Sequence, residues 1–341
     1  MQIAVIGLPQ SGKTTVLETI SSGHISHREN IATVKVPDSP LEKIGEVMGS
    51  KKITPVEIEF LDTVGDISKG GAIFSEIQGV FGIIIVLRGF DGGFGEPNPT
   101  EDARKIRKAI VDFDRSAIET RINSLSSEIN KRASGNQRQQ MEKDLQILHK
   151  FSTELKEGKF IREFCSHDLE KKLARNQGLI SAKPWFTIVN SEEKCSLENE
   201  DEISSILRSN VSIFPAKLLL ELKELTPEES SAFMDEFDIQ QNIIEQLIYE
   251  IIDWFGFVKF YTANERESHA WIVPAGTSAL KAAGKIHSDI QKGFIRAEII
   301  HWEKFVSAGG YSEARKKNLF HTEGKDYIVH NGDLIYYRFN V

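Results

Sequence analysis

The chain has 341 residues, more than the roughly 150 typical of one domain, so we expect two or three compact units. Its composition, 40% hydrophobic and 27% charged, is that of an ordinary globular protein and excludes the disordered and fibrous classes. A formal charge of −8 argues against a chain that coats nucleic acid without sequence preference, because neutralising phosphates requires clustered Lys and Arg.

Three further features bear on location and redox chemistry. No apolar run reaches the roughly 18 to 20 residues needed to cross a bilayer, so we expect no membrane partner. The chain opens on a short apolar segment without the basic start and cleavage site of an export signal, which favours a cytoplasmic protein. Cys165 and Cys195 lack the paired spacing of a zinc site or a disulfide framework, and we interpret both as thiols.

The N-terminal segment alternates strand and helix signals. Ile3–Ile6 predicts a strand, residues 7–12 a glycine-punctuated turn and Lys13–Ile20 a helix, which together begin a βαβ unit. Further short apolar runs predict strands at Thr33–Val36, Val56–Leu61, Ile83–Leu87, Trp185–Val189 and Val211–Phe214. We therefore predict an α/β fold with a mainly parallel, doubly wound sheet.

Between Pro99 and about Ile180 the sequence becomes charged and strand-free. Apolar residues recur there every three or four positions, at Ile118, Ile122, Leu125 and Ile129 and again at Leu145, Leu148 and Leu155. This spacing predicts two helices packed as an antiparallel hairpin. Because the strands resume at Trp185, we predict a helical coiled-coil arm over residues 99–180, inserted into a sheet domain of residues 1–98 and 181–255. A pair of ordinary surface helices is the alternative.

The last part of the chain predicts a small α+β module over residues 256–341. A helix is expected at about Ile239–Trp254 before it, and the module itself combines a helix at Ala279–Ile286 with strands at Val258–Tyr261, Ala270–Val273, Tyr327–Val329 and Leu334–Phe339. From Gly256 onward, 12 Lys and Arg stand against 9 Asp and Glu, so the module is mildly basic on an otherwise acidic chain. Contact with RNA is one interpretation of that charge, and an ordinary solvated surface is the other.

One motif carries a specific chemistry. Residues 7–14 fit G-x-x-x-x-G-K-[ST] and lie between a predicted strand and a predicted helix. In such a P-loop, successive backbone N–H groups face phosphates at a helix N-terminus, the Lys reaches the β and γ oxygens, and the hydroxyl of the last residue ligates Mg²⁺. We therefore predict a triphosphate site formed by Gly7, Leu8, Pro9, Gln10, Ser11, Gly12, Lys13, Thr14 and Thr15.

An acidic residue follows the strand predicted at Val56–Leu61. The segment Asp62-Thr63-Val64-Gly65 places a carboxylate at the strand's carboxyl end, where this class of fold holds its phosphates. We expect Asp62 to hold Mg²⁺ through water and the N–H of Gly65 to meet the γ-phosphate. Because D-x-x-G is common by chance, its position after the strand carries the interpretation.

The strand Trp185–Val189 ends in Asn190-Ser191-Glu192-Glu193, where P-loop GTPases of this strand order carry N-K-x-D. We expect Asn190 and Glu193 to contact the base. Glu193 is one methylene longer than the Asp that pairs with guanine, so the paired acceptor geometry need not survive, and unpaired buried groups cost about 1 to 3 kcal/mol each. The tetrad therefore favours ATP over GTP, and a strand end with unrelated polar residues is the alternative.

With these segments the chain resembles the YchF or Obg-like ATPase family of P-loop proteins along nearly its whole length. The most distinctive matches resemble that family's TGS domain and lie at Trp271–Val273, Ala282–Asp289, Lys292–Glu298 and Gly332–Asp333. The resemblance implies a G domain, a coiled-coil arm and a TGS domain, with ATP usually preferred over GTP. It also implies association with ribosomes or RNA, for which the TGS-like module and the arm are the expected contacts. A packing or oligomerisation role is the alternative for the TGS-like module.

The chain departs from the family pattern at several site positions. Gln10 stands where the family usually carries Asn, a position linked to a potassium ion, so monovalent-cation stimulation stays open. Ser26 falls, within a shortened loop, at the place of the switch Thr that ligates Mg²⁺. Asp66 stands where the family has a hydrophobic residue and Ras-like enzymes a water-positioning Gln. Pro215-Ala216 replaces a Ser-Ala motif and keeps only the Ala216 N–H as a base contact.

These residues predict a Mg²⁺-dependent triphosphatase in which water attacks the γ-phosphate in line and Lys13 absorbs the developing charge. With no identified glutamine or arginine finger, we expect slow intrinsic turnover that a partner such as the ribosome, or a cation, accelerates. Two alternatives stay open: a GTP-specific GTPase, and a nucleotide-gated module that binds RNA or protein without hydrolysis. We expect a monomer.

Overall fold

The computed structural model describes residues 1–21, 25–26, 30–67, 71–93, 95–132, 135–192, 199–236, 240 and 242–340. The chain divides into two compact units, neither of which is continuous in sequence. Unit 1 comprises Met1–Val34 and Glu59–Gln241, and unit 2 comprises Lys35–Ile58 and Asn242–Val341. The division into domains at residues 98, 180 and 255 stays a prediction.

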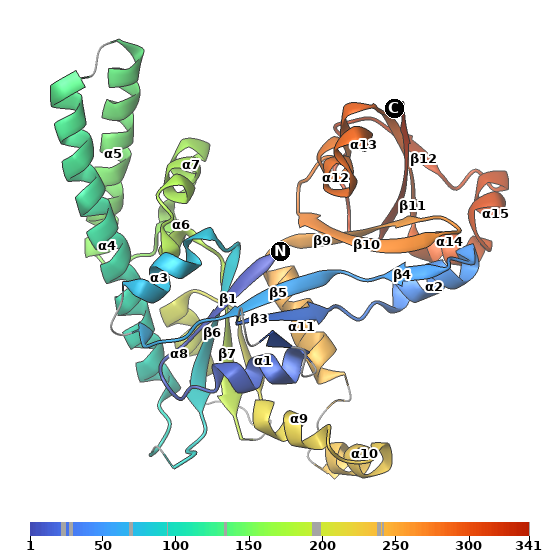
Figure 1. Ribbon diagram of the computed structural model, residues 1–341, viewed down its shortest axis with the longest axis horizontal. Helices are drawn as coiled ribbons and strands as arrows, with labels where there is room; N and C mark the ends of the chain where they lie inside the picture. Colours follow the sequence, from blue (N-terminus) through green and yellow to red (C-terminus); the bar gives the residue numbers. More distant parts are fainter. Residues whose placement is uncertain are drawn as a thin grey trace. The chain divides into compact units, whose positions relative to one another are not determined.

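Unit 1 is built on a seven-stranded sheet with the order β2-β3-β5-β1-β6-β7-β8 (Figure 1). The central strand β1 (Gln2–Ile6) pairs in parallel with both β5 (Glu57–Asp62) and β6 (Gly82–Gly89). The parallel run continues through β7 (Trp185–Ser191) and β8 (Val211–Phe214). At the other edge, β2 (Ile25–Ser26) pairs antiparallel with β3 (Ile31–Lys35). The predicted mainly parallel sheet is confirmed.

Helices cover this sheet because its central strands are apolar throughout. Every residue from Gly82 to Leu87 in β6 is buried, as expected for a strand with helices on both faces. Ile83, Ile85 and Leu87 belong to a core shared with the helices α3 (Ala72–Glu76), α4 (Pro99–Arg132) and α8 (Glu200–Leu207). On other parts of unit 1, α1 (Lys13–Ser21) packs with α9 (Ala216–Leu222), which precedes α10 (Pro227–Glu236).

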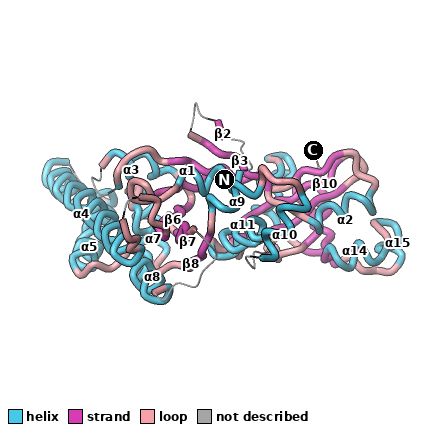
Figure 2. The backbone as a smooth tube through the Cα atoms, turned by 90° about the horizontal axis from the view of Figure 1, so that it is seen from below, coloured by secondary structure: helices cyan, strands magenta, loops and turns pink. Residues whose placement is uncertain are grey.

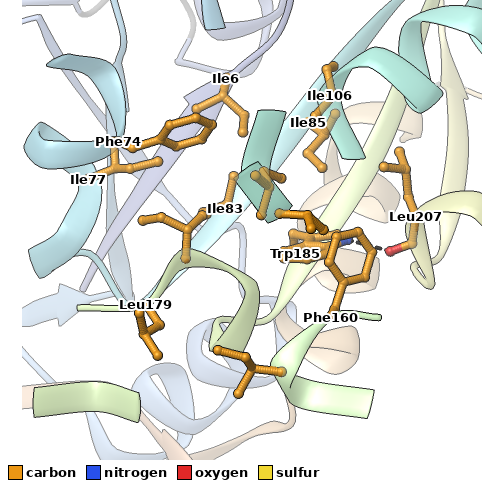
Figure 3. Close-up of a cluster of buried hydrophobic side chains, with 14 of the residues drawn as sticks. Ile6, Phe74, Ile77, Ile83, Ile85, Ile106, Phe160, Leu179, Trp185 and Leu207 are labelled. Carbon is orange, nitrogen blue, oxygen red and sulfur yellow. Dashed lines mark hydrogen bonds between the residues drawn. The ribbon is translucent and has the colours of Figure 1, made fainter. Parts of the chain in front are cut away.

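Figure 3 shows the centre of this core, where Ile6, Ile83, Ile85 and Ile106 lie together. The fully buried Trp185 packs its ring edge-on against Phe160, with ring centroids 4.5 Å apart. Its indole N–H donates to the Leu207 carbonyl at 2.6 Å, so the polar end of this large side chain is satisfied inside the core.

The helices α4 and α5 (Asn136–Lys156) form the predicted antiparallel hairpin and run side by side in both views (Figures 1 and 2). Members of the predicted stripe are buried along it: Ile118, Leu125, Leu148 and Leu155 are each at most 2% exposed. Beyond α5 follow α6 (Ile161–Phe164), α7 (Asp168–Asn176) and a short 3-10 turn at Ile180–Ala182.

The hairpin base is the place where α4 meets that 3-10 turn. Asp114 of α4 is fully buried, and its two carboxylate oxygens accept the backbone N–H groups of Ile180 at 2.8 Å and Ser181 at 2.7 Å. Burial raises the pKa of Asp114 to about 6, against the lowering effect of these hydrogen bonds. The carboxylate therefore ties α4 to the 3-10 turn that precedes β7.

Unit 2 contains a six-stranded sheet with the order β12-β11-β13-β9-β10-β4. The antiparallel pair β9 (Phe257–Ala263) and β10 (Glu267–Pro274) lies beside β13 (Asp333–Phe339), which pairs parallel with β9. β11 (Phe294–His301) joins β13 to β12 (His321–Glu323). The helices of this unit are α11 (Ile243–Trp254), α12 (Ala279–Ile286), α13 (Ser288–Lys292), α14 (Trp302–Ala308) and α15 (Tyr311–Lys316).

The strand predicted at Tyr327–Val329 is wrong. Within this stretch the structure forms one isolated antiparallel bridge, between Ile328 and Ser278. The N–H of Tyr327 turns back to the Gly324 carbonyl, and Ile328 is 42% exposed, so the segment lacks the run of partners that makes a strand. The strand β11 and the helices α14 and α15 were not predicted.

The segment Lys35–Ile58 belongs to unit 2 although its two ends continue into strands of unit 1. It contains α2 (Ser39–Met48) and β4 (Lys52–Thr54), and β4 pairs in parallel with β10. Asp38 caps α2 by accepting the N–H of Leu41 at 3.1 Å. The same buried carboxylate pairs with Lys259 at 2.8 Å and accepts the Tyr261 hydroxyl at 3.1 Å, which ties the segment to β9. Among the residues that the structure describes, no helix is both long and apolar enough to span a membrane.

Candidate nucleotide-binding site

The loop from Gly7 to Thr14 makes a tight bend between β1 and α1. A Cβ on Gly7 would lie 2.4 Å from the Val86 carbonyl oxygen, so only glycine fits where the loop crosses β6. Gln10 and Gly12 both have left-handed backbones, with φ of 66° and 81°. Leu8 and Thr15 are half-buried, Pro9 and Gln10 are exposed, and Ser11 is buried with a side-chain oxygen that has no partner among the described residues. The bend therefore has the local form that the motif predicts.

Lys13 begins α1 and folds back over this bend. Its ammonium donates to the carbonyl oxygens of Gly7 at 3.2 Å and Leu8 at 3.3 Å. Burial lowers the pKa of Lys13, while the nearby carboxylates of Asp62 and Asp66 act in the opposite direction. A cation that is partly withdrawn from water and held above the loop interacts strongly with any polyphosphate that enters it.

Thr14 and Asp62 come together across the ends of α1 and β5. The Thr14 hydroxyl donates to Asp62 Oδ2 at 2.8 Å, although the two residues are 48 positions apart. The other carboxylate oxygen, Oδ1, is buried and has no hydrogen-bond partner among the described residues. A buried carboxylate oxygen without a partner is unusual and calls for a ligand.

These two side chains fit a magnesium ion. Mg²⁺ takes oxygen ligands, keeps several waters and uses one or two protein groups together with substrate phosphates. A hydroxyl and a carboxylate with one unsatisfied oxygen match that need. The described ranges contain no group of three or more His, Cys, Asp or Glu residues that could hold a metal ion by themselves. Ser26 lies in β2, and its side chain is outside the described part of the structure.

Asn190 links the loop to the next strand. This buried residue at the end of β7 donates from Nδ2 to the Ser11 carbonyl at 3.2 Å, and its Oδ1 accepts the N–H of Ala216 at 3.3 Å. A Cβ on Gly12 would lie 2.1 Å from Asn190 Nδ2. Asn190 therefore holds the phosphate loop in place through its two amide atoms.

The remaining predicted residues are placed less completely. The Ala216 N–H is engaged with Asn190, and the Ala216 carbonyl accepts the Thr19 hydroxyl at 2.9 Å, so Ala216 is anchored beside α1. Gly65 is exposed with a φ of 134°, and a Cβ there would lie 3.1 Å from Ile73, which explains the glycine at that position. Glu193, the predicted reader of the base, lies outside the described residues.

Comparison with known proteins gives the family. The Ribosome-binding ATPase YchF of Bacillus subtilis (strain 168) is 30% identical to this chain over an alignment of 369 positions, gaps included. The alignment covers 99% of this chain and 98% of that protein. The chain belongs to the YchF family. A YchF of the same description from Escherichia coli O157:H7 is 28% identical over 363 residues, again 99% of this chain and 98% of the relative.

Two further matches agree with the YchF assignment. The YchF-GTPase_C family model, described as "Protein of unknown function (DUF933)", matches residues 257–340. The solved structure of the Schizosaccharomyces pombe YchF GTPase superposes with a TM-score of 0.83 over 99% of this chain and 97% of that one. At 20% identity, that likeness shows a common fold, a P-loop G domain with a C-terminal domain.

In this YchF-family chain, two residues that order loops beside the candidate site, Arg88 and Thr63, were not predicted from the sequence to do so. Arg88, at the end of β6, donates to the carbonyls of Phe90 at 3.1 Å and Gly95 at 2.9 Å and so organises the loop after that strand. The hydroxyl of Thr63 donates to the Val5 carbonyl at 2.6 Å and fixes the start of the D-x-x-G segment. For Arg88, a cation directly before a glycine-rich stretch was the available signal.

Proposed function

We propose that this chain is a Mg²⁺-dependent nucleoside triphosphatase that cleaves the bond between the β- and γ-phosphates, with ATP preferred over GTP. The observation that carries the proposal is the convergence of Lys13, the Thr14 hydroxyl and the Asp62 carboxylate at the carboxyl edge of one parallel sheet. The names of the curated relatives, which are ATPases, support the same reaction.

In the proposed reaction, water attacks the γ-phosphorus in line with the oxygen that bridges to the β-phosphate. That bond breaks and its electron pair stays on the diphosphate. The water oxygen leaves as part of inorganic phosphate, and the proton that the water loses passes to solvent. Lys13 neutralises charge that develops on the β and γ oxygens, and the loop N–H groups hold the phosphates in position. The Gly65 N–H orients the γ-phosphate. Thr14 and Asp62, with Ser26 as a further proposed ligand, would hold a magnesium ion, which would supply positive charge near the same oxygens.

Turnover is proposed to be slow in the isolated protein. Asp66 occupies the position where Ras-like enzymes place a water-orienting Gln, and it contributes electrostatically to Lys13. Single-turnover release of labelled γ-phosphate tests this: a rate well below one per second is expected for the protein alone. A fast burst would contradict slow hydrolysis, and complete retention of triphosphate with ribosomes present would favour the module that binds without hydrolysing.

The base preference rests on the contact proposed for Glu193 and has a specific rival, because the solved relative is named a GTPase. Calorimetric titration of ATP and GTP in the presence of Mg²⁺ separates the two. At least tenfold tighter binding of ATP is expected. Replacement of Glu193 by Asp provides the matched variant, since it shortens the side chain and keeps the charge. A gain in GTP affinity is expected for Glu193→Asp, and equal affinities in both proteins would contradict the proposed base contact.

Association with the ribosome is the proposed context of the reaction. The curated relatives are named ribosome-binding, and residues 256–341 carry a net positive charge on an acidic chain. The proposed contacts are the TGS-like module, residues 256–341, and the α4–α5 hairpin. Co-sedimentation of the full chain with ribosomes, with and without a non-hydrolysable ATP analogue, tests this. Sedimentation that is unaffected by ribosomes in either state would contradict it.

A further inference from the structure

Unit 2 contains a cluster of four charged residues that the triphosphatase does not use: Glu298 with Arg296, Arg315 and Arg338. Arg296 and Glu298 lie on one face of β11, and the sheet register sets Arg338 of β13 directly opposite Arg296. Like charges in this position repel each other unless something compensates them. The intervening residue Ala297 and the next, Ile299, point into the hydrophobic core on the other face. The charged cluster therefore lies on the face of this sheet that is opposite the hydrophobic core.

Glu298 provides the compensation. Its side chain is 4% exposed and accepts two hydrogen bonds from Arg338, at 3.2 and 3.1 Å, one from Arg296 at 3.3 Å and one from Arg315 of α15. Burial alone would raise the pKa of Glu298, but Arg338 and Arg315 outweigh it and lower the pKa to about 2. The Tyr311 hydroxyl accepts from Arg315 and Arg338 at 2.7 Å each and fixes the two guanidinium groups further.

One carboxylate for three guanidinium groups leaves a net charge of +2. The side chains of Arg296, Arg315 and Arg338 keep 53%, 47% and 47% of their surface exposed. Among the described residues, no hydrogen-bond acceptor contacts the Nη1 group of any of the three. Arginine N–H groups that are already oriented lose little freedom on binding an anion, and the planar fork matches the oxygens of a phosphate.

The surface beside the cluster has room for a ligand. A hollow of about 340 Å³ is lined by Arg296, Glu298, Arg315, Asn318, Phe320 and Thr322. A second hollow of about 840 Å³ includes Arg338, Tyr311, Tyr336 and Arg266 in its lining. A phosphate on the arginines could therefore carry a sugar or a neighbouring nucleotide into either hollow.

We propose that Arg296, Arg315 and Arg338, held by Glu298, form a binding site for a phosphate group, with the phosphodiester backbone of an RNA strand as the first source to test. The choice of RNA rests on the ribosome association proposed above, whereas the inference does not depend on hydrolysis at Lys13. A nucleoside phosphate is the other source of the same chemistry.

The test uses the full chain and a labelled 12-nucleotide single-stranded RNA, with affinity measured by fluorescence anisotropy at several salt concentrations. Arg315→Gln is expected to weaken RNA binding about tenfold and to reduce the salt dependence by about one phosphate contact. Lys281→Gln is the matched control, because it also removes one positive charge from an exposed position. Lys281 lies on α12, which packs against the opposite, core-facing side of the sheet. Lys281→Gln and Lys13→Ala are both expected to bind RNA like the wild type.

A second measurement keeps the proposal testable if Arg315→Gln is poorly folded. Phenylglyoxal labelling of wild-type protein, read by peptide mass spectrometry, reports the accessibility of each arginine. RNA is expected to protect the three cluster arginines. Protection by inorganic phosphate or ATP in the Lys13→Ala protein, without protection by RNA, would assign the site to a free phosphorylated ligand. Equal labelling under all conditions, together with wild-type RNA affinity in Arg315→Gln, would overturn the site.

Discussion

Two regions of unit 1 each contain an aspartate with a buried carboxylate oxygen. One is the edge proposed to bind phosphate, made by the loop 7–14, Asp62 and Asn190 and called here the phosphate-binding edge, and the other is the hairpin base around Asp114. At the hairpin base both oxygens of Asp114 are taken by backbone N–H groups, at 2.8 and 2.7 Å. At the phosphate-binding edge, Asp62 uses one oxygen for Thr14 and keeps the other buried without a partner among the described residues. The fold therefore satisfies both oxygens of Asp114 internally and leaves one oxygen of Asp62, the acid proposed to hold Mg²⁺, without a partner among the described residues.

The largest effect expected from this comparison is on Lys13. Lys13→Ala should slow turnover by about 10² to 10³-fold, roughly 3 to 4 kcal/mol, because it removes the cation that faces the β and γ oxygens. Single-turnover hydrolysis measures this. Lys223→Ala is the control: its ammonium also donates to a backbone carbonyl, of Thr19 at 2.5 Å, but away from the loop. Comparable loss of activity in both variants would contradict a specific role for Lys13 at the phosphate-binding edge.

Gly12→Ala should cost about 2 to 3 kcal/mol in nucleotide affinity. The new Cβ would meet Asn190 Nδ2 at 2.1 Å, and a φ of 81° is strained for alanine by roughly 1 to 2 kcal/mol. Gly158→Ala is the control outside the loop, since its φ of 77° strains the backbone similarly but nothing lies within 4 Å of the added Cβ. Affinity measured by calorimetry should fall for Gly12→Ala alone, whereas an unchanged value would mean that Asn190 does not hold the loop.

The hairpin base should show a pH dependence of stability. The folded-state pKa of Asp114, about 6, lies above its ordinary value of 3.8, so the folded protein binds this proton more tightly than the unfolded chain does. The resulting stability is fully present below pH 3.8 and is lost as the pH rises through 6. The free energy of unfolding of the wild type, relative to Asp114→Asn, should fall by about 2 kcal/mol between pH 4.5 and 7.

Urea denaturation at both pH values measures this difference. The comparison with Asp114→Asn removes the contributions of the other titrating groups, which both proteins share. A difference in unfolding free energy that stays constant with pH would mean that Asp114 titrates as an ordinary carboxyl. A change in the nucleotide affinity of Asp114→Asn would mean that the hairpin base and the phosphate-binding edge are coupled.

The smallest effect is expected for Asp62→Asn. The amide keeps an oxygen for the Thr14 hydroxyl but loses the charge that attracts Mg²⁺, so the Mg²⁺ concentration for half-maximal hydrolysis should rise about tenfold, about 1.4 kcal/mol. Glu59→Gln removes the same charge from an exposed position on the same strand and serves as control. A magnesium titration that is identical in all three proteins would remove Asp62 from the proposed metal site.

Much of the fold could be predicted from local sequence signals. The P-loop helix was predicted as Lys13–Ile20 and extends over Lys13–Ser21, and the arm was predicted from Pro99, where α4 begins, because glycines, caps and apolar spacing act over a few residues. The pairing of β4 with β10 could not be predicted, since it joins residues more than 200 positions apart. For the site, the sequence placed Asn190 at a strand end, but the packing of its amide over Gly12 depends on how two strands meet.

The interruption of unit 1 by the segment Lys35–Ile58 limits how the molecule can be divided experimentally. Leu41 and Ile44 of α2 are fully buried, and β4 draws its sheet partner from residues 267–269. A truncation that ends near residue 255 would therefore leave an N-terminal fragment in which the apolar face of α2 is uncovered and β4 is unpaired. Both features favour aggregation. Separating the two units cleanly would require excising residues 35–58 and bridging Val34 to Glu59 with a short turn.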